Sequence, residues 1–284
     1  MNLESLGVII ILSEGRLYMK RNLNKGLVAI IAVLLLLSLS ACSNSKNATP
    51  ESDGKVLKVG STGLVYPFSF KEGDKLEGFD IEVVEKIADK MGYEIEWQLT
   101  DFSGLMGQLE SGKLDTVANQ VAVTAVREEK FDFSEAYAYD GTQIIVKNDN
   151  NDIKSVEDLK GKKVAAVLGS NHAANLEEQD SANEIDIKTY EAHDGMLNEL
   201  DFGRIDAYVN GKNILLAEIE KCGLPLKTVG DPISNDKVAF PFVKDNKNDK
   251  LIEEFNQALA DLQEDGTLKE LSEKYFKEDV TVSN

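Results

Sequence analysis

The chain has 284 residues and is acidic, with 31 Lys and Arg against 50 Asp and Glu and a formal net charge of −19. This excess of negative charge argues against nucleic acid and anionic lipid headgroups as electrostatic partners. The two cysteines and two histidines have no ligand spacing, so neither a disulfide framework nor a metal site is predicted. The length allows two modest α/β domains behind a leader segment.

Residues 1–42 have the pattern of a lipoprotein signal peptide. Basic residues precede an apolar run over 27–37, and small residues follow it up to Cys42, which together form a lipobox pattern. These flanking residues are Lys20, Arg21, Lys25, Ser40 and Ala41. We therefore expect Cys42 to carry a diacylglyceryl thioether, whose acyl chains would anchor the mature protein on the extracytoplasmic face of the cell membrane.

A membrane-spanning helix is the alternative interpretation of the apolar run. A span needs about 20 apolar residues, whereas the polar sequence SNSKNATPESDGK begins directly after Cys42. Residues 43–55 are accordingly predicted to be a polar tether. Because MKRNLNKG is already a complete signal-peptide start, we hypothesise that translation begins at Met19.

From residue 55 onward, short β-branched runs alternate with amphipathic stretches, which predicts an α/β architecture with mainly parallel sheets. Strands are expected over 56–60, 93–99, 115–119, 141–147, 163–168, 186–190, 205–210 and 238–243. Helices are expected over 79–91, 194–203, 212–222, 249–265 and 267–276. SVEDLKG opens with a capping box from Ser155 to Asp158, and Cys222, one residue before a glycine, is expected to be a small buried residue.

Two extended segments, near 140–147 and 237–243, bracket a middle block of strand and helix units. A chain that leaves one domain, builds a second and returns to the first must cross between them twice. We therefore expect one lobe to contain 56–140 plus 240–284 and a second lobe to contain 141–239. A cleft between two α/β lobes is where ligands bind at the carboxyl ends of strands.

The stretch from Gly78 to Val83, with Ile87, Ala88 and Met91, resembles the motif of the family 3 solute-binding proteins, the amino-acid receptors of ABC importers. Further matches are Tyr66-Pro67-Phe68, Asp101 to Gly104, Thr124, Arg127, Phe133-Ser134, Tyr137, Gly169 to Asn171, Gly203 to Ala207 and Gly266 to Leu268. The resemblance covers 55–280, and over 117–121, 165–173 and 240–242 it is greatest to L-cystine-binding lipoproteins of Gram-positive bacteria. It implies a two-lobed, type II periplasmic-binding-protein-like fold with two hinge crossings.

The resemblance also implies a site for the α-carboxylate of an amino acid. Arg127 matches the family arginine, whose planar guanidinium can hold a carboxylate with two parallel hydrogen bonds. The N–H of Ala122 matches a second donor, and Ser170, Asn171 and His172 open a predicted helix whose N-terminus would face the same anion. The alternatives are a surface arginine, plain helix capping by Ser170 and Asn171, and a histidine that merely starts a helix.

Other matched positions would surround the rest of the ligand. Phe102 matches an aromatic that packs on the ligand side chain, and Tyr66 lies one position beyond a frequent aromatic wall. Either aromatic could instead belong to the core of a lobe. The backbone carbonyls of Asn119 and Gln120 match acceptors for the ligand ammonium.

This chain departs from the family pattern at the ammonium. Many members carry a carboxylate after the strand over 205–210, where this chain has Asn210-Gly211, and a second frequent acid is Thr62 here. A buried ammonium without a counter-charge is unfavourable. Three solutions remain open: Asp140 or another acid compensates, carbonyls and Asn210 suffice, or the ligand is not a simple α-amino acid.

The resemblance thus predicts a monomeric, lipid-anchored receptor that captures L-cystine, or a related polar or sulfur-containing amino acid, and presents it to an ABC permease. No cofactor and no metal are expected. A receptor for a different polar amino acid is one alternative. A cleft enzyme such as a prephenate-type dehydratase is another, but the candidate positions suit binding better than proton transfer.

Overall fold

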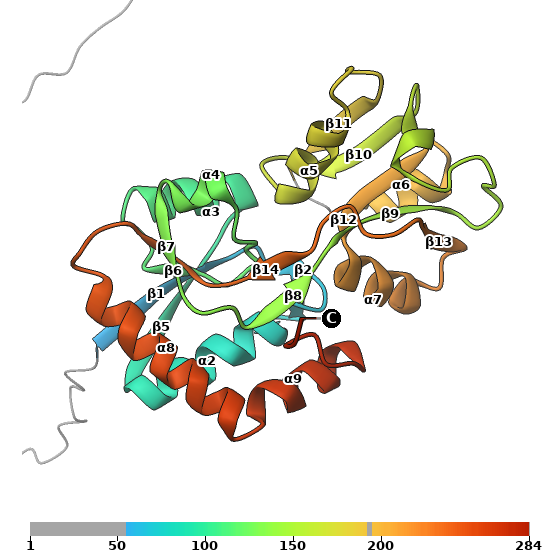
Figure 1. The fold of residues 1–284 in the computed structure, drawn as a ribbon. Coiled ribbons are helices and arrows are strands. Elements are labelled where there is room, and N and C mark those ends of the chain that lie inside the picture. The colour runs from blue at the N-terminus through green and yellow to red at the C-terminus, as the bar shows by residue number, and fades with distance from the viewer. Residues whose placement is uncertain (1–54, 192–194, 284) are drawn as a thin grey trace, which may run out of the picture. The chain divides into compact units, whose positions relative to one another are not determined.

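The computed structural model describes residues 55–191 and 195–283, in which strands and helices alternate along the chain (Figure 1). The predicted signal peptide with Cys42, the hypothetical start at Met19 and nearly all of the tether lie outside the described residues. Within these ranges no helix has both the length and the hydropathy that crossing a membrane requires.

The first sheet is parallel and has the strand order β5-β1-β6. Its strands are β1 (Lys55–Ser61), β5 (Tyr93–Leu99) and β6 (Thr116–Val117). Helix α2 (Phe79–Met91) buries Ile81, Val84, Ile87 and Ala88 on one face and ends at Gly92, whose φ of 71° is the left-handed conformation that favours glycine. Helices α8 (Asp249–Glu264) and α9 (Thr267–Phe276), from the end of the chain, pack on α2 (Figure 1).

A small antiparallel sheet, which the sequence did not predict, lies between β1 and α2 along the chain. It has the order β2-β3-β4, formed by β2 (Leu64–Val65), β3 (Ser69–Glu72) and β4 (Lys75–Glu77). Strands of two to four residues are too short to show a clear alternation of apolar and polar positions. The same applies to the short helix α4 (Ala125–Glu128), which follows the longer α3 (Phe102–Glu110).

The second sheet is mixed and has the order β11-β10-β12-β9-β13. Its strands are β9 (Thr142–Lys147), β10 (Lys163–Val167), β11 (Asp186–Tyr190), β12 (Ala207–Gly211) and β13 (Leu226–Val229). Its helices are α5 (Asn171–Gln179), α6 (Met196–Asp201) and α7 (Lys212–Cys222). The predicted capping box between Ser155 and Asp158 is confirmed and opens the 3-10 helix η1 (Val156–Leu159).

Two short pairs of antiparallel strands connect the segments between these sheets. Strand β8 (Ala138–Asp140) pairs with β14 (Asp236–Val238), and β7 (Phe131–Phe133) pairs with β15 (Pro241–Val243). The single strand predicted over 238–243 is therefore two strands, which pair with different partners. The chain passes toward the second sheet through β8 and returns through β14, as expected for two crossings (Figure 1).

Each sheet has apolar clusters of its own. One large cluster joins β1, α2, α8 and α9, and two others cover the two faces of the second sheet. The prediction that Cys222 is buried was wrong, because this residue is exposed at the end of α7. The fully buried positions of α7 all lie in its first two turns. In its last turn Ile219 packs against the core, while Cys222 faces solvent. The lobe limits at 140/141 and 239/240 stay a prediction.

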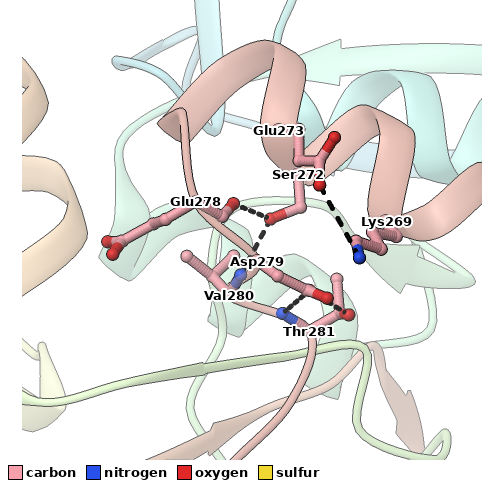
Figure 2. Close-up of polar contacts among 7 residues, drawn as sticks. All are labelled: Lys269, Ser272, Glu273, Glu278, Asp279, Val280 and Thr281. Carbon is pink, nitrogen blue, oxygen red and sulfur yellow. Dashed lines mark hydrogen bonds and ion pairs between the residues drawn. The ribbon is translucent and has the colours of Figure 1, made fainter.

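The segment after α9 is fastened by hydrogen bonds of Ser272 (Figure 2). Its hydroxyl donates to the Glu278 carbonyl oxygen at 2.7 Å and accepts from the Val280 N–H at 2.8 Å. The Val280 carbonyl oxygen in turn accepts from the N–H of Tyr139 in β8 at 2.8 Å. The end of the chain therefore lies against one of the two crossing strands.

Candidate ligand-binding site

A cavity of about 350 Å³ lies at the carboxyl ends of strands from both sheets. Its residues follow β1, β5 and β6 in the first sheet and β10 and β12 in the second. This volume is at the lower end of the range for small-molecule sites. The predicted site residues that line it are Phe102, Asn119, Gln120, Ser170, Asn171, His172 and Asn210.

Tyr66 does not line this cavity. Its ring packs against Phe70, with the ring centroids 5.0 Å apart, and the Lys221 ammonium lies 3.9 Å from the Tyr66 centroid. These residues line a separate hollow between β3, α7 and α9. The residue nearest to the expected aromatic wall in sequence therefore contacts a lysine outside the cavity.

Arg127 does not line the cavity but lies next to Phe102, which does. Its guanidinium is 5.4 Å from the centroid of the Phe102 ring and donates to the carbonyl oxygens of Ala122, at 2.8 Å, and of Gly169, at 3.4 Å. Burial lowers the pKa of Arg127 to about 10, while Asp236 acts in the opposite direction. The side chain is therefore charged at neutral pH and connects the end of β6 to the start of α5.

The backbone of Ala122 forms part of a short bridge to Val238. In this bridge the Val123 N–H donates to Lys237 and the Ala239 N–H donates to Val121, which directs the Ala122 amide away from the bridge. Among the described residues, the Ala122 N–H has no hydrogen-bond acceptor. This geometry is compatible with the predicted role as a donor to an anion.

Ser170 is the N-cap of α5, as the capping interpretation expected. Its hydroxyl accepts from the Ala173 N–H at 3.1 Å and donates to the Val167 carbonyl oxygen at 2.8 Å. Its own N–H also donates to Val167, at 3.1 Å. The amides that an α-helix leaves without an internal acceptor at this end are therefore those of Asn171 and His172.

The side chains of Asn171 and His172 are buried and bound to the protein. Asn171 Nδ2 donates to Asp236 Oδ2 at 2.9 Å, and His172 Nδ1 lies 2.9 Å from Thr142 Oγ1. Burial and the nearby Arg127 lower the pKa of His172 to about 3. The imidazole is therefore neutral at physiological pH and offers no positive charge to an anion.

Asn119 and Asn210 are also engaged by protein groups. Asn119 Oδ1 accepts from the N–H of Thr62 at 2.9 Å and from its hydroxyl at 2.7 Å, which fixes the turn after β1. Asn210 Nδ2 donates to the Tyr208 hydroxyl, and Asn210 Oδ1 accepts from the Gly211 N–H at 2.9 Å. Both amides therefore shape the cavity wall while their hydrogen-bonding capacity is partly used.

Gln120 is held between two buried carboxyl groups. Its N–H donates to Asp80 Oδ2 at 2.5 Å, and its Nε2 donates to Asp140 Oδ2. Its φ of 51° lies in the left-handed region, which is strained for a residue with a side chain. Burial raises the pKa of Asp80 and of Asp140 to about 7.

Asp80 was not predicted to be part of the site, because it lies within an apolar helical pattern. Its Oδ1 and the neighbouring Tyr137 hydroxyl are both buried without a hydrogen-bond partner among the described residues. Burial and this carboxyl group raise the pKa of Tyr137 well above its ordinary value, although the two groups do not meet the geometry of a hydrogen bond. The sequence contains one sign of this role, because Asp80 places an acidic side chain next to the buried apolar positions of the helix.

Apolar and charged residues complete the cavity. Leu64, Leu99 and Phe102 are among its apolar lining residues, and Lys71 and Glu191 also line it. Within residues 55–191 and 195–283, no group of three or more His, Cys, Asp or Glu is placed to hold a metal ion. The cavity thus combines an apolar wall with the start of a helix.

Known proteins share this architecture and much of this sequence. The model of the bacterial extracellular solute-binding proteins, family 3, matches residues 57–278. The "Probable amino-acid-binding protein YxeM" of Bacillus subtilis (strain 168) is 57% identical over 260 residues, covering 92% of this chain and 98% of that protein. The L-cystine-binding protein TcyJ of Escherichia coli (strain K12) is 34% identical over 261 residues, covering 90% and 97%.

A solved structure has the same fold. An ancestral arginine-binding protein bound to arginine superposes with a TM-score of 0.74 at 35% identity, covering 78% of this chain and 98% of that one. The family model, the two relatives and this structure agree with the two-lobed α/β fold that the sequence predicted. The chain therefore belongs to the bacterial extracellular solute-binding proteins of family 3.

Proposed function

We propose that this chain is a lipid-anchored receptor of an ABC importer that captures L-cystine, or a related polar or sulfur-containing amino acid, and presents it to a membrane permease. The observation that carries the proposal is the meeting of three features at one cavity. Phe102 lines the cavity, the Arg127 guanidinium lies over the Phe102 ring, and the first residues of α5 also line the cavity.

These features suit an α-amino acid carboxylate. The helix start supplies the amides of Asn171 and His172 and the positive end of the helix dipole. Arg127 supplies a charged, planar donor whose present acceptor at Gly169 is only weakly held, at 3.4 Å. Because these donors come from segments next to different sheets, a ligand that binds both favours the closed arrangement of the two lobes.

The remainder of the cavity suits the side chain of cystine. Leu64, Leu99 and Phe102 offer an apolar surface of the kind a disulfide prefers. Lys71 and Glu191, one cation and one carboxylate, also line the cavity and could receive the second zwitterionic end of the molecule. The similarity to the L-cystine-binding protein TcyJ supports the same ligand class.

A receptor for arginine is the second candidate, supported by the similarity to the arginine-bound ancestral protein. Glu191 and Asp101 both line the cavity and would attract a guanidinium. Asp101 Oδ1, however, already accepts from the Gly104 N–H at 2.7 Å as the N-cap of α3. This engagement leaves less of its carboxylate for a ligand, so we favour cystine.

An enzyme of the prephenate-type dehydratase class is less well supported. Acid–base catalysis needs a group whose pKa lies near the working pH and that reaches the substrate. Asp140 has a pKa raised to about 7, but it does not line the cavity and its oxygens are bound by Gly141, Asn213 and Gln120. His172 lines the cavity, but its pKa is lowered to about 3 and it is bound to Thr142. We therefore propose binding without catalysis, with no cofactor, by a monomer.

A thermal-shift panel tests the ligand. L-cystine, L-cysteine, L-methionine, L-arginine, L-glutamine and L-histidine would be added separately to the purified mature chain. A compound present at about 100 times its Kd stabilises the fold by about 2.7 kcal/mol, which raises Tm measurably. A shift with arginine and none with cystine would contradict the cystine assignment, and no shift with any amino acid would contradict the receptor function.

Membrane fractionation tests the anchor. The full chain, expressed in a Gram-positive host with labelled palmitate, should be labelled and should sediment with membranes. Cys42→Ala should abolish the label and remove the stable membrane anchor, because two or more acyl chains are needed for stable attachment. Cys222→Ala is the matched control, since this exposed cysteine lies outside the predicted lipobox. An unlabelled wild-type chain would contradict the anchor.

A further inference from the structure

The space beside Gly211 is filled by a pair of polar side chains from elsewhere in the chain. A Cβ atom at Gly211 would lie 2.3 Å from Asp140 Oδ2 and 2.8 Å from Gln120 Nε2. Both distances are shorter than a carbon atom can reach unless the Asp140 and Gln120 side chains move away. The absence of a side chain at the end of β12 is therefore what allows Asp140 and Gln120 to meet there.

The chemistry of the pair fixes the orientation of the Gln120 amide. Asp140 is buried, and its Oδ1 accepts from the N–H groups of Gly141, at 2.8 Å, and Asn213, at 3.1 Å. An ionised carboxylate only accepts hydrogen bonds, so the amide group that meets Oδ2 is the Nε2 of Gln120. The Oε1 of Gln120 is left as the acceptor end of a side chain that lines the cavity.

The backbone of Gln120 is fixed as firmly as its side chain. Asp80 Oδ2 accepts its N–H, and its left-handed φ of 51° is maintained by that bond from one side and by Asp140 from the other. A residue bound at both ends has little freedom to reorient when a ligand enters. Its acceptor atom is thus held in advance of binding.

We infer that Asp140 supplies the negative charge for the ligand ammonium and that the Gln120 amide transmits it, with Nε2 bound to Asp140 and Oε1 accepting from the ammonium. Hydrogen-bonded groups polarise one another in a buried setting, so a carboxylate behind the amide strengthens its oxygen as an acceptor. This inference rests on the proposed function, because it requires an amino acid in the cavity.

The charges around Asp140 agree with this role. Its carboxyl group is buried next to Gly141, Asn213 and Gln120, and the charged side chain that acts on it among the described residues is Asp236, of the same sign. Asp236 in turn binds Asn171 and acts on Arg127. Within the described part of the chain no cation pairs with Asp140, so a ligand ammonium would stabilise its ionised form.

The test separates an effect on the ammonium from an effect on the fold. L-cystine and 3,3′-dithiodipropionic acid, which is cystine without its two amino groups, would be titrated into wild type and Asp140→Asn by calorimetry at pH 8. We expect the variant to bind L-cystine at least about 10-fold more weakly, while its affinity for the deaminated acid changes less than about 3-fold. Equal losses for both probes, or no loss for either, would overturn the inference.

Two further variants serve as controls for this test. Asp180→Asn is the matched control, since the Asp180 carboxyl is also buried and accepts from two N–H groups, of Glu184 and Ile185, away from the cavity. It should bind L-cystine like wild type. The double variant Asp140→Ala/Gly211→Asp, which moves the carboxylate to the neighbouring position, should regain part of the lost affinity, and a further loss of affinity in a folded double variant would count against the inference.

The outcomes also distinguish this inference from the proposed function. If L-arginine shifts the wild type and L-cystine does not, the same comparison is made with L-arginine and 5-guanidinopentanoic acid. A wild-type chain that binds neither amino acid overturns the receptor function and the inference together. In another outcome the wild type binds one of these amino acids, and the Asp140→Asn variant still discriminates fully against the deaminated analogue. This result overturns the inference but leaves the receptor function intact.

Discussion

The two walls of the cavity use their residues differently. The wall next to the first sheet presents the Phe102 ring, and the Arg127 guanidinium lies 5.4 Å from the centroid of that ring. On the wall next to the second sheet, the side chains of Ser170, Asn171 and His172 are all bound to other protein groups. The first wall therefore offers side chains to a ligand, whereas the second offers mainly backbone amides.

This difference indicates how sequence changes should act on the two walls. If the proposed function holds, a substitution in the first wall removes a group that contacts the ligand or that positions such a group. A substitution in the second leaves the amides in place unless it disturbs the start of α5, because every residue except proline carries the same backbone N–H. Affinity should thus be sensitive to side-chain identity on one side and to helix geometry on the other.

The largest effect is expected for Arg127→Ala. Loss of a guanidinium that holds a carboxylate at a partly buried site should weaken binding of the amino acid found in the panel by more than about 100-fold, or about 3 kcal/mol. Calorimetry measures this change. Arg204→Ala is the control, because Arg204 pairs with Glu199 on an exposed surface. Equal affinity of Arg127→Ala and wild type for the amino acid would contradict the proposal that side chains of the first wall recognise the ligand.

The next prediction concerns the pH dependence of stability that arises from Asp80, whose carboxyl group accepts the N–H of Gln120. Burial raises its pKa from 3.8 to about 7, so the folded chain retains a proton that the unfolded chain loses between these values. Relative to Asp80→Asn, the wild type should therefore lose stability by about 1.4 kcal/mol per pH unit between about pH 4 and pH 7, and no further above that range. Urea unfolding at several pH values measures the difference, and a constant difference would contradict it.

A smaller effect on affinity is expected from the aromatic wall. Phe102→Leu keeps an apolar side chain but removes the flat surface over which Arg127 lies, so affinity should fall by about 3- to 10-fold. Tyr66→Leu, in the separate hollow with Lys221, should leave affinity unchanged. Calorimetry on both variants compares two aromatics that sequence alone treated alike. Equal losses in the two variants would show that Phe102 has no special contact with the ligand.

The smallest effect is expected at the second wall. Ser170→Ala removes the N-cap of α5 and should lower the free energy of unfolding by about 1 kcal/mol, with a small loss of affinity as the helix start loosens. Ser155→Ala, in the capping box of η1, should lower stability without changing affinity. A loss of affinity larger than that of Phe102→Leu would mean that the Ser170 side chain binds the ligand itself.

Much of the fold followed from the sequence because its long elements have regular patterns. Strand β5 and helices α7 and α9 have the predicted bounds, and Gly92 and Gly223 end their helices as left-handed caps. Strands β2, β3, β4, β7, β8 and β13, of two to four residues, were missed, since periodicity needs more residues to be visible. Cys222 was misjudged because helical spacing gives a face but not how far the core extends along it.

Seven of the ten predicted ligand-binding residues line the cavity, whereas Tyr66, Ala122 and Arg127 do not. The hydrogen bonds that connect these residues were not predicted. Phe102, Gln120 and the start of α5 were placed at the cavity by resemblance and by their positions after strands. The role of Asp80 and the position of Tyr66 depend on which segments pack together in three dimensions, and no local pattern contains that information. Gly211, noted in the sequence as a missing acid, has a different significance in the structure, where it is a space filled by Asp140 and Gln120.

The close contact among Gly211, Asp140 and Gln120 makes stepwise mutation at these positions unfavourable. Any side chain gained at Gly211 collides with Asp140, and loss of Asp140 alone leaves the cavity without its inferred negative charge. A change from one arrangement to the other therefore has an unfavourable intermediate whichever position changes first. Efforts to redesign the ligand preference of this chain should vary positions 120, 140 and 211 together, because libraries that randomise one of them at a time would discard the functional combinations.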